Sequence, residues 1–541
     1  MGANRELPAL GARLLNHGDA AAAARRADTG RKGALAGRGD AADERESRSR
    51  GSRLLPALVS CGVLASALVL GVPLHTAQTA RTVQSAASVV AAAAQSSSWS
   101  APATLGACPA GAHAWVVFPS DSPSHATGAG AIVWSASARC PGGEGARIAP
   151  LGAGDAPAQS AVPRTSAGRA LAPYGPLLAS GAPRGQIAIA GSAPGAAAAG
   201  MVIQGAATGP FSTLPAPEGS RSPMALTTAY LGDLALAAPP ALSSGRPARA
   251  VRPARGAGRD AGLRVHVERF YDPHGFARDG FAGSAGGGPV QAPAIALDYR
   301  SEALAVWAQA GAIYARLLPA QGAPGPIQRL ARGARDPQIT AVLSDDEHGI
   351  VAWSERRGDE TAVYLDRSAV GVRFGAAELV ERFRDPDGLL APAASPRLVR
   401  LSSESVMLAW AGEAGGRWVV RTAPVDLDRL GPASTIAAPG GDALLAGLAP
   451  GPHGEALVLW TEPQDEGAGR VELARQALFA ARGYDAYPGE TYFGEAEQIA
   501  PPAPVAGASA AFDPDSGRAV AVWRGQGGAI EYSIRAAGPP R

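Results

Sequence analysis

The side chains of this sequence that could do chemistry follow a repeated tryptophan. Five apolar runs end on Trp, at Trp307, Trp353, Trp410, Trp460 and Trp523. A polar residue stands within three positions of each one, namely Gln309, Glu355, Glu413, Glu462 and Arg524. Several carboxylates around one opening could bind a cation, a sugar or a basic partner, or supply an acid/base pair. The alternative is that each glutamate merely occupies a solvated turn. We take the five polar residues as candidate ligand-binding residues.

A second candidate site is an arginine-rich segment at residues 244–260. Its arginines recur every three or four residues among Pro, Gly and Ala, at Arg246, Arg249, Arg252, Arg255 and Arg259. Guanidinium groups bind phosphate, sulfate and carboxylate through paired hydrogen bonds, so the segment could hold an anionic group. The alternative is a disordered, solvated insertion. No aromatic residue is interleaved with the arginines, so we expect no nucleic-acid partner.

Other reactive patterns are weak. Asp513-x-Asp515-x-Gly517, with an echo at Asp385-x-Asp387-Gly388, could begin a calcium loop, but the distal Glu of an EF-hand is absent and Asp and Gly are ordinary turn residues. No Gly-x-Ser-x-Gly occurs, and the histidines are scattered without metal-ligand spacing. We therefore predict no catalytic residue, no metal and no cofactor.

The composition excludes several classes of chemistry. The only lysine among 541 residues is Lys32, and no asparagine follows Asn16. The body of the chain therefore has no P-loop Lys, no Schiff-base Lys and no N-glycosylation acceptor. The net charge is +2, so no overall field favours nucleic acid or an acidic membrane.

The first part of the chain has the pattern of a region that directs export across a membrane. Residues 1–53 are polar and rich in Ala, Gly and Arg, which predicts a disordered cytoplasmic tail. Residues 54–74 carry no charge, which at about 1.5 Å per residue is long enough to span a membrane as a helix. Arginines precede this segment, which places the rest of the chain outside. The alternatives are a cleaved signal peptide, with the body secreted, and a lipoprotein signal around Cys61.

Outside the membrane we expect a linker at residues 75–96, a domain at 97–541 and a disulfide between Cys108 and Cys140. These are the only two cysteines beyond the membrane segment, and an oxidising compartment favours their pairing.

The candidate residues lie on a repeated β-hairpin. The stretch at residues 349–367, GIVAWSERRGDETAVYLDR, has two apolar strands around a charged turn, and similar phrases surround the other four tryptophans. The tryptophans are 46, 57, 50 and 63 residues apart, which is the size of a four-stranded blade of a β-propeller. Three diverged copies precede them at residues 130–136, 184–191 and 231–238. The fold class is therefore all-β, a propeller of eight blades, or seven if one diverged copy is not a blade.

The last repeat lacks the sequence of an outer strand. Residues 97–106, SSWSAPATLG, precede the first repeat and resemble such an outer strand. We predict that this N-terminal strand completes the last blade and closes the ring, which would pair strand edges that otherwise invite aggregation. A linear β-solenoid is the competing architecture.

The repeats resemble those of bacterial exported β-propeller proteins, with a distant likeness to Asp-box repeats of the sialidase type. The residues that carry this likeness are LSDDEHGIVAW at 343–353 and FDPDSGRAVAVW at 512–523, which share an acidic turn, a Gly and a following Trp. The Ser-x-Asp-x-Gly-x-Thr-Trp spacing of the Asp box is not met. The resemblance implies an architecture only, and no catalytic residue is transferred.

Three functions remain open. The favoured one is a non-catalytic, membrane-tethered, extracytoplasmic propeller that binds a protein or a glycan. The alternative is a glycan-active hydrolase or lyase that uses carboxylates among Glu355, Glu413 and Glu462. A third role, an envelope scaffold, would dock another protein on the arginine-rich segment.

Overall fold

A computed structural model describes most of the predicted domain. It covers residues 99–537 apart from 107–109, 120–128, 142, 153–155, 183–184, 194–199, 215–224, 229–233, 239–261, 269–277, 284–288, 345–347, 370–372, 385–394, 403–404, 427, 437–441, 464–475 and 488–489. The predicted tail (1–53), membrane segment (54–74) and linker (75–96) lie outside the described residues. Within the described residues no helix has the length and apolar character needed to cross a membrane.

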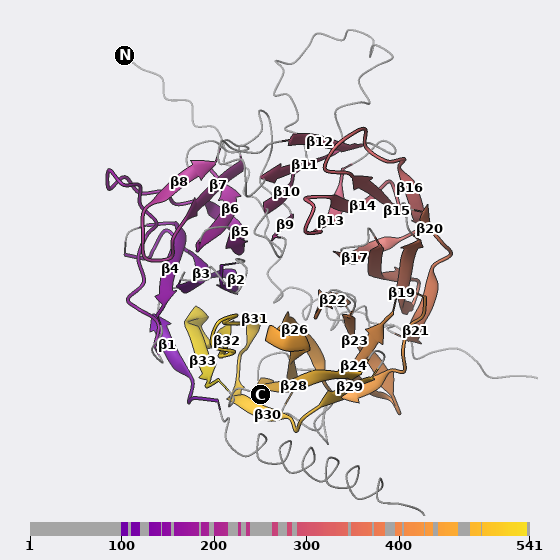
Figure 1. Ribbon diagram of the computed structural model, residues 1–541. Coiled ribbons are helices and arrows are strands. Elements are labelled where there is room, and N and C mark those ends of the chain that lie inside the picture. Colours follow the sequence, from indigo (N-terminus) through magenta and orange to yellow (C-terminus); the bar gives the residue numbers. More distant parts are fainter. Residues whose placement is uncertain are drawn as a thin grey trace, which may run out of the picture. The chain divides into compact units, whose positions relative to one another are not determined.

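The described residues form an all-β structure with a propeller-like repeat of antiparallel sheets, whose strands are labelled in Figure 1. In chain order, the first four sheets are β2 (Ala110–Val117), β3 (Gly130–Ala136), β4 (Gly145–Leu151); β5 (Tyr174–Ala182), β6 (Gln186–Ser192), β7 (Gly200–Gly205), β8 (Phe211–Leu214); β9 (Ala225–Thr228), β10 (Leu234–Ala238), β11 (Leu263–Glu268), β12 (Arg278–Gly283); and β13 (Gln291–Leu297), β14 (Ala303–Gln309), β15 (Ala312–Leu318), β16 (Gln328–Arg332).

The remaining sheets continue the same order. They are β17 (Arg335–Leu343), β18 (Gly349–Arg357), β19 (Glu360–Ala369), β20 (Arg373–Phe374), β21 (Glu378–Arg384); β22 (Arg397–Arg400), β23 (Val406–Ala414), β24 (Arg417–Val425), β25 (Ser434–Ile436); β26 (Leu444–Pro450), β27 (Glu455–Pro463), β28 (Gln476–Tyr487), β29 (Glu490–Phe493), β30 (Glu497–Ala503); and β31 (Ala506–Phe512), β32 (Ala519–Arg524), β33 (Ile530–Arg535) with β1 (Ala103–Gly106). Two short 3-10 turns, Pro452–Gly454 and Gln526–Gly528, complete the described elements.

The second strand of each sheet corresponds to an apolar segment that the repeated hairpin sequences predicted to be a strand. β3, β6, β10, β14, β18, β23, β27 and β32 match the eight predicted copies, which confirms these strands. Every residue of β3 and of β14 is buried, because each sheet packs on a neighbour through both of its faces. The five tryptophans are among the largest fully buried side chains of the described residues. Each such ring removes about 150–250 Å² from water, so these strands carry much of the core.

Apolar clusters join each sheet to the next one in the chain. For example, one cluster combines Trp307 of the fourth sheet with Val265 of the third, and another combines Trp410 of the sixth with Leu365 of the fifth. The eighth sheet also packs on the first, because Val522 and Tyr532 share a cluster with Trp134.

The first described strand joins the end of the chain. β1 pairs antiparallel with β33, with Ala103 opposite Tyr532, and the two strands lie side by side in Figure 1. Just before β1, Ser100 forms hydrogen bonds with the last strand: its backbone N–H donates to Ile534 O at 2.8 Å, and its carbonyl accepts from Ser533 Oγ at 2.7 Å. The segment that the sequence marks as a spare outer strand therefore occupies the outer position of the eighth sheet.

In several sheets the same residue of the first strand contacts the neighbouring sheet. This residue pairs with the one that directly precedes the Trp of the second strand. In the fifth sheet, Thr340 Oγ1 accepts from Leu398 N at 3.3 Å, and in the eighth, Ser509 Oγ accepts from Val116 N at 3.2 Å. Trp115 fills this position in the first sheet and donates from Nε1 to Leu177 O of the second at 2.9 Å. The contact from the eighth sheet to the first thus has the same geometry as the contact from the fifth to the sixth.

Candidate functional site

The polar residues that follow the tryptophans have a structural partner. Trp460 donates its indole N–H to Glu462 Oε1 at 2.8 Å, and Trp307 donates to Gln309 Oε1 at a longer 3.4 Å. Residues two apart on a strand point to the same face, which places the acceptor beside the ring. A buried indole N–H needs an acceptor, and the Trp-x-Glu or Trp-x-Gln spacing supplies one within the strand.

Other sheets supply the acceptor from elsewhere. Trp410 donates to Glu381 Oε2 at 2.6 Å, and Trp523 donates to Glu531 Oε2 at 2.8 Å. The fifth sheet differs, because Trp353 Nε1 has no hydrogen-bond partner within the described residues. There the side chain of Glu355, which is 0% exposed, forms an ion pair with Arg357 at 2.6 Å, although neither carboxylate oxygen has the alignment of a hydrogen bond.

Three of the five candidate residues are therefore enclosed in the sheets. Gln309, Glu355 and Glu462 are at most 5% exposed, so they do not stand in solvated turns. Glu413 is half-buried, and its backbone N–H donates to Glu381. Arg524 is also half-buried, at the end of β32.

Two further predictions fall partly or wholly outside the described residues. The arginine-rich segment belongs to the connection between β10 and β11 and is not described. Cys140 is buried, but Cys108 is not described, so the disulfide stays a prediction.

The Asp513 motif builds a turn. Its carboxylate accepts from the backbone N–H of Asp515 at 3.2 Å and from Ser516 Oγ at 2.8 Å, and Gly517 adopts a positive φ of 69°. Turn formation thus accounts for the spacing of these acidic residues. Within the described part of the chain, no group of three or more His, Cys, Asp or Glu side chains is arranged to hold a metal ion.

The beginnings of several first strands are irregular in the same way. Gly175, Ala292, Asp336 and Gly507 each have positive φ at a register shift between the first and second strands. Such β-bulges redirect side chains, and a positive φ at Ala292 or Asp336 is strained because the residue has a Cβ. In the fifth and eighth sheets this end of the first strand pairs with the end of the second strand, at Arg356 and Arg524.

Basic groups gather at this end from sheets far apart in the sequence. His113 lies in the register shift of β2, where its side chain is exposed to solvent. Desolvation by the surrounding protein, together with the positive charges of Arg397 and Arg524, nevertheless lowers its pKa. Arg397 begins β22 and occupies the same position as Thr340 and Ser509. Its Nη2 lies 3.5 Å from Ala446 O of the next sheet, and no other hydrogen bond or ion pair of this guanidinium occurs within the described residues.

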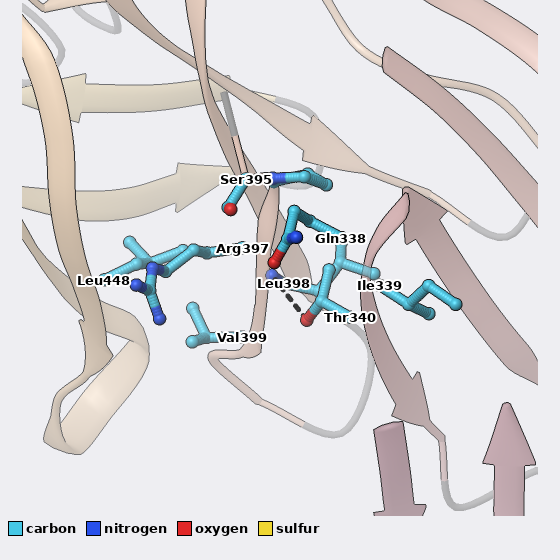
Figure 2. Close-up of a pocket in the computed structure, with 9 residues that line it drawn as sticks. Gln338, Ile339, Thr340, Ser395, Arg397, Leu398, Val399 and Leu448 are labelled. Carbon is cyan, nitrogen blue, oxygen red and sulfur yellow. Dashed lines mark hydrogen bonds between the residues drawn. The ribbon is translucent and has the colours of Figure 1, made fainter. Parts of the chain in front are cut away.

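A pocket of about 280 Å³ adjoins Arg397, between β17 and β22 (Figure 2). Its lining comes from Gln338, Ile339, Thr340, Ser395, Pro396, Arg397, Leu398, Val399 and Leu448. Figure 2 shows the bond between Thr340 and the backbone of Leu398 crossing from one strand to the other. Most of the wall is therefore made where two neighbouring first strands, β17 and β22, meet, with polar groups from both of them, and Leu448 of β26 completes it.

Sequence reasoning did not find His113 or Arg397. It noted only that the histidines lack metal-ligand spacing, and it did not single out Arg397. The available signal was a His and an Arg in the segments that precede the predicted second strands. What the sequence could not give is that residues 113, 397 and 524 come together.

One buried acid lies outside this basic group. Asp366 of β19 is 3% exposed, and burial raises its pKa to about 6, although backbone N–H groups of Arg367 and Gly375 and the charge of Arg367 offset part of the effect. The folded state therefore holds this proton more tightly than the unfolded state, whose pKa is near 3.8.

We predict that Glu462→Ala lowers the free energy of unfolding by about 1–3 kcal/mol, because the buried indole N–H of Trp460 loses its acceptor. Glu462→Gln should keep most of the stability, since Gln309 fills the same position in the fourth sheet. Urea unfolding followed by tryptophan fluorescence measures both. Equal losses in the two variants would contradict the role of acceptor.

We predict that Asp366→Asn stabilises the protein at pH 7. The wild-type penalty is absent below pH 3.8 and grows as the pH rises to about 6, because ionisation is then favoured in the unfolded state. Discounted for solvent screening, the gain at pH 7 is about 1–2 kcal/mol. Unfolding curves at pH 4 and pH 7 test this, and a gain that is the same at both values would contradict it.

Comparisons with known proteins give no family. No family model matches the chain, and no curated protein matches it. Among solved structures, it is similar to an α-L-arabinanase from Penicillium chrysogenum (10% identity, 46% of this chain and 93% of that chain, TM-score 0.27), to virginiamycin B lyase from Staphylococcus aureus (12%, 64% and 91%, TM-score 0.31) and to a sialidase from Trypanosoma rangeli (10%, 61% and 56%, TM-score 0.30). Similarity this low carries no argument about function.

Proposed function

We propose that the protein is a closed, eight-bladed β-propeller that binds a ligand without transforming it. Eight sheets occur among the described residues, and apolar clusters join successive sheets. Three contacts support closure by the N-terminal strand: the pairing of β1 with β33, the Ser509–Val116 bond, and the bond from Arg518 to Gly152 O at 2.9 Å. A solenoid would have no reason to join its last repeat to its first.

The proposal includes an export route taken from the sequence. The uncharged segment 54–74 anchors the protein in the cell membrane, with the propeller outside. In the alternative form the segment is cleaved and the propeller is secreted.

The absence of catalysis is supported by the surroundings of the candidate carboxylates. Glycoside hydrolysis uses two carboxyl groups about 5–10 Å apart on either side of a bound sugar. Glu355 and Glu462 are enclosed, and Glu462 accepts from Trp460. Of the three candidate glutamates only Glu413 is partly accessible, so an acid/base pair cannot be assembled from them in this arrangement. A glycan-active hydrolase or lyase is therefore the weaker alternative.

The observation that carries the binding function is the pocket between β17 and β22. It combines a guanidinium, a primary amide and hydroxyl groups with apolar walls, which is the mixture found in sites for small polar ligands or for one group of a larger ligand. The ligand we propose is a protein or a glycan, held at the end of the first strands. The arginine-rich segment would add a second, cationic contact.

We predict binding without turnover. The full-length protein should bind at least one member of a glycan array or a peptide array, and it should hydrolyse or eliminate none of a panel of aryl glycosides above the rate of heat-denatured protein. Turnover that disappears in Glu355→Gln, Glu413→Gln or Glu462→Gln would contradict the proposal and establish the enzyme.

A further inference from the structure

Within the part of the chain that the structure describes, no acid balances the positive charge at the pocket beside Arg397. No carboxylate forms an ion pair with Arg397 within the described residues, and its hydrogen bond to Ala446 O, at 3.5 Å, is long. The Arg397 side chain is exposed to solvent, yet enough protein surrounds it to lower its pKa by desolvation. A side chain in a solvent-filled hollow enclosed by protein has both properties. Arginine keeps its charge in proteins, so the hollow is cationic at neutral pH.

A second positive charge strengthens this field. Arg524 comes from the eighth sheet, and its charge acts with that of Arg397 on His113 of the first sheet, whose lowered pKa keeps the imidazole neutral at neutral pH. Among the described residues, no carboxylate belongs to the groups that shift the pKa of this imidazole. Enclosure by protein reduces screening, so such a cluster attracts an anion and repels a cation.

The neutral groups of the pocket suit an oxyanion. Thr340 Oγ1 already accepts from Leu398 N, so its hydroxyl hydrogen is directed elsewhere and is able to donate to a ligand oxygen. Gln338 contributes an amide from the same strand, and Ser395 a hydroxyl from the segment before β22. The planar fork of Arg397 offers parallel N–H donors to two oxygens of one group.

We propose that this pocket binds a carboxylate, phosphate or sulfate group of the ligand, with Arg397 as the main contact and Gln338, Thr340 and Ser395 as neutral partners. The positive charge of Arg524 also attracts the anion to the site. The inference rests on the proposed binding function and gives its ligand an anionic group. A volume of about 280 Å³ accommodates one such group with a small carrier, for instance one acidic sugar unit.

The test is isothermal titration of the full-length protein with sodium glucuronate, sodium phosphate and sodium sulfate, and with glucose as the neutral counterpart of glucuronate. We expect at least one anion to bind and glucose not to bind. Arg397→Gln should weaken the anion about tenfold or more, because a charged hydrogen-bonded contact is lost. Arg397→Lys, which keeps the charge but lacks the fork, should give an intermediate loss.

Arg400→Gln is the matched control. Arg400 lies on the same strand, does not line the pocket, and donates from Nε to Ser402 O at 2.9 Å. Its variant should bind as the wild type does. Circular dichroism and the unfolding midpoint establish that each variant is folded.

Three results would overturn the inference: anions that bind no better than glucose, an affinity unchanged in Arg397→Gln, or an equal loss in Arg400→Gln. The proposed function is judged separately. A glycan or peptide that binds on the arrays but is insensitive both to Arg397→Gln and to competing anion would leave the binding function intact and refute this site.

Discussion

The contact between the eighth sheet and the first is the interaction on which the proposed account depends. The first strand of each sheet has an edge without a strand partner, and a buried backbone N–H at such an edge needs another acceptor. Ser509 supplies that acceptor for Val116, as Thr340 does for Leu398. Because the two bonds join equivalent positions, the last and first sheets meet as neighbours do in the middle of the chain. This junction brings His113 within reach of the charge of Arg524, and without it the basic group of three would not exist.

The buried tryptophans explain why acidic residues recur in the repeats. Each ring contributes a large apolar surface to the core, but its N–H must be satisfied. Four of the five rings meet this need with a residue two positions later, with Glu381 of the neighbouring sheet or with Glu531 of the adjacent strand, whereas Trp353 Nε1 has no partner within the described residues. A repeated Glu is therefore compatible with a structural role, and its recurrence gives no support for a catalytic site.

The strand pattern was largely predictable from the sequence because it depends on local features. Apolar runs that end on Trp mark the second strands, and the outer-strand phrase at residues 97–106 marks a segment without a partner nearby. The role of Glu462 was not predictable in this way. Its spacing from Trp460 is compatible both with a solvated turn and with an acceptor on one strand face, and only the burial of the strand end decides between them.

The basic group of His113, Arg397 and Arg524 could not be predicted from the sequence, for a different reason. His113, Arg397 and Arg524 belong to the first, sixth and eighth sheets, and each looks like an isolated polar residue in its own strand. The two arginine charges act on His113 only when the ends of the first strands are brought together, where bulges such as that at Asp336 interrupt the regular pairing. The binding site proposed here is thus a property of how the sheets are assembled, and no single repeat contains it.

Site-resolved hydrogen exchange of the Val116 amide tests the proposed closure most directly. In the full-length protein this N–H should be protected, and in Ser509→Ala its exchange should accelerate about tenfold or more, as the loss of one hydrogen bond of about 1.4 kcal/mol implies. The Leu398 amide, whose acceptor is Thr340, should be unaffected in the same variant. A Val116 amide that exchanges in the wild type as fast as an unstructured peptide would contradict the closed arrangement.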